Sequence, residues 1–353
     1  MDSPNQQNKA SLLQEVIDRD PKAADMRISL FVSAARSFKY DSCLQPFPSD
    51  YLEDREKNIG ALNKVLDGLP PLIGLKTIDL DEKQVDLLYW LLCRQTTIPA
   101  LRSVEKMDFE SVFAKAPCLA EFQRPQYVFK VKYPEDSGAE KKFMRHKKEF
   151  PSYHAYHGSK VFNFYSILSY GLQQHLNKTA LYGEGIYLST ELHVSQMFAP
   201  TGGGWPRSAL GSHLSCTAVC EYIDNPAYVK CQEENQTGEF PEKYILIKNN
   251  EMVQVRYLLV YGSNQTVTSG RHSNWQLQTK FNQKAQQPQR QQVGGCVQWL
   301  AANKSWLLAV SYVLMLFAIG LMNNPNAYYM RKMFLQKINH MCSALFRSEQ
   351  DTS

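Results

Sequence analysis

The sequence predicts an α+β protein with an N-terminal helical bundle, a β-rich domain and a C-terminal transmembrane helix. Apolar residues first recur at helical spacing, short strand-like runs follow, and a long uncharged apolar run comes near the end. The predicted boundaries are 1–105 for the helical region, 106–125 for a connector, 126–262 for the β-rich domain, 263–303 for a polar linker, 304–324 for the transmembrane helix and 325–353 for a basic amphipathic tail.

The composition favours a folded protein in a reducing compartment. Hydrophobic residues make up 44% of the 353 residues and charged residues 21%. The net charge of +5 comes without a dense basic helix, so we expect no nucleic-acid partner. The eight cysteines include no C-x-x-C pair, and the closest two, Cys216 and Cys220, are poorly spaced for a disulfide along one strand. We therefore expect free thiols, no metal site and, given the polar N-terminus, no secretory signal.

Helix signals recur through the first hundred residues. Asp20-Pro21 is a typical helix start, because proline is tolerated at the first helical position. A second helix is expected to begin at Ser49 or Asp50, after two prolines, and a third near Asp79 or Asp81. None of these segments carries a motif typical of catalysis.

The following segment alternates like a set of short strands. A helix is expected near Lys160–Tyr170, ended by Gly171. The basic stretch 141–148 is interpreted as a solvated hairpin arm, with a charged contact surface as the alternative. The predicted strands lie at Val128–Tyr133, Tyr153–Tyr156, Gly185–Leu188, Leu214–Tyr222, Tyr244–Ile247 and Val255–Tyr261.

The apolar run begins at Trp306, ends at Met322 and contains no charge. A bilayer requires about 17–25 such residues, and Trp306 stands where an interfacial aromatic is common. A buried core helix is the alternative interpretation. No acidic residue occurs over 252–348, so this part of the chain suits an anionic membrane surface. The tail 326–353 is predicted either to lie in the headgroup region or to form a short solvated helix.

Three short motifs stand in a defined order within the β-rich segment. His157-Gly158-Ser159 follows a strand, a G-x-G-x-Y element ends at Tyr187, and Tyr244 opens a later strand. Each motif alone is weak, because tight turns often produce such patterns. Together, over about residues 125–262, they resemble the catalytic domain of the poly(ADP-ribose) polymerase family, the diphtheria-toxin-like ADP-ribosyltransferases. The resemblance implies a mixed or antiparallel β-rich transferase domain that uses NAD⁺ as substrate and needs no metal.

The resemblance also assigns roles to particular residues. Gly158 and Ser195 would hold the nicotinamide carboxamide, the Tyr187 and Phe198 rings would enclose the nicotinamide, and His157 would bond the adenine ribose. The implied NAD⁺-binding set is His157, Gly158, Ser159, Tyr187, Ser195 and Phe198. The implied catalytic set is His157, Tyr187 and Tyr244.

Tyr244 occupies the position at which chain-forming members of the family carry glutamate. A carboxylate there can polarise a ribose hydroxyl for attack on the next NAD⁺, whereas a phenol, with a reference pKa of about 10, is a poor base near pH 7. The resemblance therefore implies transfer of one ADP-ribose per acceptor site. The alternatives are a module that binds NAD⁺ or ADP-ribose without chemistry, and a membrane scaffold.

The order of helical region, transferase and C-terminal span resembles the tail-anchored, endoplasmic-reticulum branch of the family. It implies a single-pass protein of that membrane or the nuclear envelope, with residues 1–300 in the cytosol. The expected partners are NAD⁺, protein acceptors at the membrane surface, the chain itself and the lipid bilayer. The helical region is expected to pack against the transferase and regulate it.

Overall fold

The computed structural model describes residues 4–94, 98–116, 124–176, 183–230 and 244–263. The predicted linker, apolar run and basic tail lie outside these ranges. Among the described residues, no helix is long and apolar enough to cross a bilayer. The membrane span therefore stays a prediction.

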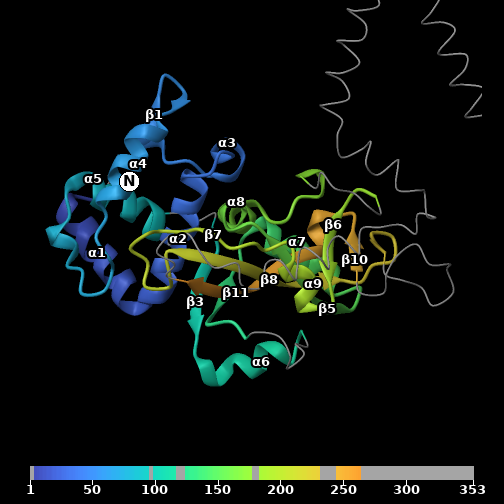
Figure 1. The fold of residues 1–353 in the computed structure, drawn as a ribbon. Coiled ribbons are helices and arrows are strands. Elements are labelled where there is room, and N and C mark those ends of the chain that lie inside the picture. Colours follow the sequence, from blue (N-terminus) through green and yellow to red (C-terminus); the bar gives the residue numbers. More distant parts are fainter. Residues whose placement is uncertain (1–3, 95–97, 117–123, 177–182, 231–243, 264–353) are drawn as a thin grey trace, which may run out of the picture. The chain divides into compact units, whose positions relative to one another are not determined.

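The N-terminal region is helical, as predicted (Figure 1). The side chains of Asn5, Asp20, Asn58 and Asp81 each cap a helix by accepting a hydrogen bond from the backbone N–H three residues on. The helices are α1 (Gln6–Arg19), α2 (Pro21–Ala35), α3 (Tyr40–Cys43), α4 (Ile59–Gly68) and α5 (Glu82–Tyr89), with short turns η1 (Ser49–Tyr51), η2 (Thr77–Asp79) and the π-helical turn η3 (Trp90–Arg94).

The described strands of the second region form one antiparallel sheet in the order β3-β4-β11-β8-β5-β6-β10-β9, with β7 beside β8. This arrangement confirms the α+β class and the antiparallel sheet. The strands are β3 (Ala100–Val104), β4 (Tyr127–Lys132), β5 (Ser152–Ser159), β6 (Ile186–Ser189), β7 (Gly202–Gly203), β8 (His213–Ile223), β9 (Val229–Lys230), β10 (Tyr244–Ile247) and β11 (Val253–Ser263).

Short helices connect these strands. The helix expected before Gly171 is present, and Gly171 ends it with φ +78°, a conformation that favours glycine. The connecting elements are η4 (Lys106–Asp108), α6 (Phe109–Phe113), α7 (Gly138–Lys147), η5 (Val161–Asn163), α8 (Phe164–Tyr170), η6 (Gln174–Leu176), α9 (Leu192–Gln196) and η7 (Asn250–Met252).

Three local predictions were wrong. The second helix begins at Ile59 instead of Ser49 or Asp50, because Asp54 and Arg55 take positive φ and turn a small hairpin, β1 (Leu52–Glu53) and β2 (Glu56–Lys57). Residues 100–104, assigned to the helical region, form an edge strand against β4. The basic stretch 141–148 is no hairpin arm and lies mostly in helix α7. Ser137 caps this helix, and Phe143 is its one buried side chain.

One hydrophobic core joins the helical region to the sheet. Helix α2 is buried along most of its length, and the Phe31 ring meets that of Tyr165 edge-on at 5.2 Å. The buried Asp25 carboxylate of α2 accepts hydrogen bonds from the Ser208 hydroxyl and, at 2.8 Å, from the Ala209 N–H. Burial outweighs these bonds and raises the pKa of Asp25. A helix of the N-terminal region thus holds the loop between β7 and β8.

Candidate active site

The first motif lies at the carboxyl end of β5. Antiparallel pairing with β8 places His157 opposite Ala218, Gly158 opposite Thr217 and Ser159 opposite Cys216. The next strand in the sheet on the other side of β5 is β6, which carries Tyr187. The first two motifs, about thirty residues apart in the chain, therefore stand on neighbouring strands.

A hydrogen bond joins the two motifs directly. His157 Nδ1 lies 3.0 Å from the Tyr187 carbonyl oxygen. A carbonyl only accepts, so Nδ1 carries the proton and Nε2 is left as an acceptor for a hydroxyl group. Burial lowers the pKa of His157 below its usual 6.5, although the carbonyl contact opposes this. His157 is therefore neutral at physiological pH, which suits an acceptor for a ribose hydroxyl.

The glycines before Tyr187 shape the turn into β6. Gly183 has φ +108°, a region that residues with a Cβ rarely adopt. The Tyr187 hydroxyl donates a 2.7 Å hydrogen bond to the Gly183 carbonyl. This bond fixes the phenol and holds the ring against the turn.

Gly158 contacts helix α9 so closely that no other residue fits. A Cβ at this position would stand 1.7 Å from the Ser195 carbonyl oxygen and 3.2 Å from the Phe198 Cβ. Ser195 is buried, with 3% of its surface exposed, whereas Phe198 is 55% exposed. The structure therefore brings together Gly158, Ser195 and Phe198, as the resemblance implied, and leaves one aromatic ring open to a ligand.

Tyr244 is placed by strand register. On β10 it stands opposite Ser189 of β6, and Leu246 stands opposite Tyr187. Because residues two apart on a strand share a face, Tyr187 and Tyr244 are diagonal neighbours, typically about 7–8 Å apart. All seven predicted site residues thus lie on β5, β6, β10 and the α9 segment, and Asn163 donates a 2.9 Å bond to the seventh, Ser159.

Sequence reasoning missed the residues that hold α9 in place. Gln196 Nε2 donates to the Tyr261 hydroxyl at 2.8 Å, and the Ser215 hydroxyl donates to the Ala199 carbonyl at 2.6 Å. These bonds tie both ends of the Ser195–Phe198 segment to β11 and β8. No sequence signal marks them, because the partners are distant in the chain and ordinary in type.

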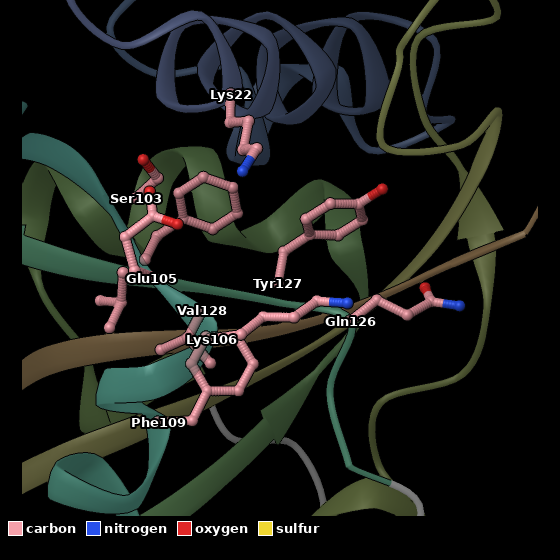
Figure 2. Close-up of a pocket in the computed structure, with 10 residues that line it drawn as sticks. Lys22, Ser103, Glu105, Lys106, Phe109, Gln126, Tyr127 and Val128 are labelled. Atoms are coloured by element: carbon pink, nitrogen blue, oxygen red, sulfur yellow. The ribbon is translucent and has the colours of Figure 1, made fainter.

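Two cavities elsewhere in the described residues lack every predicted site residue. Figure 2 shows one of about 50 Å³ between Lys22 at the start of α2 and the Tyr127–Phe129 segment of β4, with room for a few water molecules at most. The other, about 660 Å³, lies between Arg27 and the 132–137 segment. The case for the site therefore depends on the contacts and chemistry of its residues, and not on either of these two cavities.

This fold and site define an ADP-ribosyltransferase that uses NAD⁺. Residues 111–238 match the poly(ADP-ribose) polymerase catalytic domain, and residues 15–92 match the ARTD15 N-terminal domain. The chain is 37% identical over 282 residues to the protein mono-ADP-ribosyltransferase PARP16 of Mus musculus and 36% identical to that of Homo sapiens. Each alignment covers 74% of this chain and 86% of the relative. The chain therefore belongs to the poly(ADP-ribose) polymerase family.

Proposed function

We propose that the chain transfers one ADP-ribose unit from NAD⁺ to each acceptor site on proteins, itself included, at a membrane surface. In this reaction the bond between nicotinamide and ribose breaks, and nicotinamide leaves with the bonding electrons. The acceptor's nucleophilic atom forms a new bond to the same ribose carbon, and its proton passes to solvent. The protein must therefore orient both the nicotinamide leaving group and the acceptor relative to the ribose carbon.

The contacts around Gly158 are the observation that carries this proposal. A backbone position without a Cβ, lying against Ser195, suits hydrogen bonding to a flat carboxamide. The exposed Phe198 ring and the tethered Tyr187 ring offer two aromatic surfaces for nicotinamide. The neutral His157 offers Nε2 to a ribose hydroxyl.

Tyr244 and the relatives support single transfer. A phenol in place of a carboxylate cannot readily activate a ribose hydroxyl, so a transferred unit is a poor acceptor for the next one. The two PARP16 relatives carry the name mono-ADP-ribosyltransferase. The size of the label released from the acceptor tests this part of the proposal. Single ADP-ribose units are expected, and ADP-ribose chains would contradict single transfer.

The apolar run of 306–322 supports a membrane anchor, and we place the catalytic domain on the cytosolic side of the endoplasmic reticulum. Residues 306–322 carry no charge, and the basic tail after them suits an anionic headgroup region. The cytosolic side is supported by the use of NAD⁺ and by the free thiols of Cys43, Cys93, Cys216 and Cys220. Protease added to sealed microsomes should digest residues 1–300. Protection of those residues would overturn this orientation.

Automodification of the full chain with labelled NAD⁺ tests the enzyme itself. The wild-type chain should become labelled, and Tyr187→Ala should lose most of the label because one nicotinamide-stacking surface is gone. Tyr170→Ala is the matched control, since Tyr170 is 55% exposed on α8 and belongs to no predicted site. Equal labelling of the two variants would contradict the assigned role of Tyr187.

The absence of a carboxylate at Tyr244 favours one competing function, a scaffold that binds NAD⁺ or ADP-ribose without chemistry. The same experiment separates the two. Binding of NAD⁺ without any label or nicotinamide release from the wild-type chain would establish the scaffold.

A further inference from the structure

Two aromatic rings form an exposed pair on the surface of the protein. Phe38 lies in the turn between α2 and α3 and is 80% exposed, more than any other aromatic residue that the structure describes. Its ring meets that of Phe162, in η5, edge-on at 6.2 Å. Phe162 itself packs on the core, so the pair is a fixed surface feature. Burying the exposed Phe38 ring against an apolar partner would be favourable.

Each ring of the pair carries a lysine ammonium group beside it. Lys39 Nζ lies 5.5 Å from the centre of the Phe38 ring, and Lys160 Nζ lies 5.8 Å from the centre of the Phe162 ring. Both lysines are exposed. Neither forms an ion pair with a carboxylate in the described part of the chain.

The remaining charges around this turn are compensated. Arg36 forms an ion pair with Asp67, and the Asp41 Oδ1 atom lies 3.6 Å from Lys57 Nζ. The net feature is two aromatic rings and two positive charges without local acidic partners. We call Phe38, Lys39, Lys160 and Phe162 the aromatic-lysine patch.

The patch lies next to the donor site along the chain. Lys160 directly follows the His157-Gly158-Ser159 motif, and Asn163, next to Phe162, donates to the Ser159 hydroxyl. The patch also combines one turn of the N-terminal region with one turn of the transferase. A ligand of the patch would therefore lie near the carboxyl end of β5 and contact both the N-terminal region and the transferase.

We infer that the aromatic-lysine patch docks on an anionic lipid surface and orients the catalytic domain on the membrane. Phenylalanine inserts at the acyl boundary, and lysines beside it bind anionic headgroups. The inference rests on the proposed membrane anchor.

A second contact is needed because the anchor alone does not set orientation. The described structure ends at Ser263, and the transmembrane helix is predicted to begin at 304. The 40 residues between these two points can reach at most about 140 Å. That exceeds the radius of gyration of about 18 Å expected for a domain of this size. Such a tether lets any face of the domain reach the bilayer, and the patch selects one.

The test uses the full chain reconstituted in vesicles of phosphatidylcholine and phosphatidylserine, with bromine on the acyl chains to quench nearby tryptophan. Phe38→Trp places a new tryptophan in the patch. Ile73→Trp is the matched control, since Ile73 is 77% exposed in the N-terminal region outside the patch. We expect the brominated lipid to quench the fluorescence added by Phe38→Trp and to leave that added by Ile73→Trp unchanged.

Charge reversal then tests the lysines. Adding Lys39→Glu or Lys160→Glu to Phe38→Trp should weaken the contact at least fivefold per lysine, since loss of one positive charge alone costs about 1 kcal/mol. Omitting phosphatidylserine should abolish the quenching. Quenching that survives both changes would overturn the anionic lipid surface as the ligand.

The outcomes separate this inference from the proposed function. If the chain floats with the vesicles but Phe38→Trp is quenched no more than Ile73→Trp, the anchor stands and the patch assignment is wrong. If the full chain fails to float, both are wrong. A blue shift of the Phe38→Trp emission that depends on protein concentration, without vesicles, would assign the patch to a second copy of the chain instead.

Discussion

The two sides of the His157 strand are built differently. On the α9 side, Gly158 meets the Ser195 carbonyl so closely that a single added carbon would collide with it. On the β10 side, Tyr244 is placed by strand pairing with Ser189, and its side chain is half-buried. In the proposed function, the α9 side holds NAD⁺, and its close packing tolerates little change. In the proposed function, the residue at position 244 on the β10 side decides whether a second unit can be added. Because strand pairing fixes only the backbone, this position can carry different side chains.

Gly158→Ala should have the largest effect, because it breaks the α9 side. The new Cβ would stand 1.7 Å from the Ser195 oxygen, so α9 must move. A displacement of about 1 Å can cost about a hundredfold in rate. We expect at least that loss in kcat/KM for NAD⁺, measured by nicotinamide release. Gly138→Ala is the control, since a Cβ there meets nothing within 4 Å. Equal activity of the two variants would contradict the contact.

Gln196→Ala should have an intermediate effect by loosening the same side. It removes the 2.8 Å bond to the Tyr261 hydroxyl and leaves the site residues in place. Loss of one such bond costs about 1 kcal/mol, so KM for NAD⁺ should rise about fivefold with a smaller change in kcat. Tyr261→Phe removes the same bond from the other partner and should match it. A fall in kcat at unchanged KM would refute a positioning role.

Tyr244→Phe should have a small effect, because it changes the permissive side. The hydroxyl is a poor base near pH 7, so activity should fall less than about fivefold, the value of one hydrogen bond. The products should remain single ADP-ribose units, as judged by the size of the label released from the acceptor. A loss as large as that of Gly158→Ala would place Tyr244 in the transfer step itself.

The pH dependence should be the smallest effect. The pKa of His157 lies below 6.5 in the folded state, so the residue is neutral on both sides of pH 7. The neutral form is favoured by folding, and this preference begins to cost stability only as the pH falls below 6.5 toward the folded pKa. Activity carried by neutral His157 should be flat from about pH 8 down to that value. A titration of kcat/KM centred above pH 7 would show that another group controls binding.

Local patterns predicted those parts of the molecule that depend on neighbours in the chain. The caps at Asp20 and Asp81, the Gly171 helix end and most strands follow from spacing and turn chemistry. Residues 141–148 were misread because their charges hide the single buried residue, Phe143, that anchors α7 to the sheet. The recurrence of apolar residues no longer marks a helix when a single apolar side chain is enough to anchor it.

The sequence predicted which residues would form a candidate site, but not the contacts between them. The resemblance assigned His157 and Tyr187 to one site, and the structure places them on adjacent strands joined by a hydrogen bond. The Gly158–Ser195 contact joins residues far apart in the chain, and the Gln196–Tyr261 bond joins residues 65 positions apart. Such distances depend on how α9 packs on the sheet, which no local pattern encodes. The predicted membrane span lies outside the described residues and stays a prediction.

The position of α2 bears on where this chain can be divided. Phe31 fills space against Tyr165, and Asp25 accepts the hydrogen bonds of Ser208 and Ala209. A protein cut before Ala100 would keep every predicted site residue, yet it would expose the apolar face that α2 covers and leave the Ser208 and Ala209 donors without their acceptor. The N-terminal helices and the transferase are therefore one cooperative folding unit, and inherited changes on α2 should behave as changes to the enzyme.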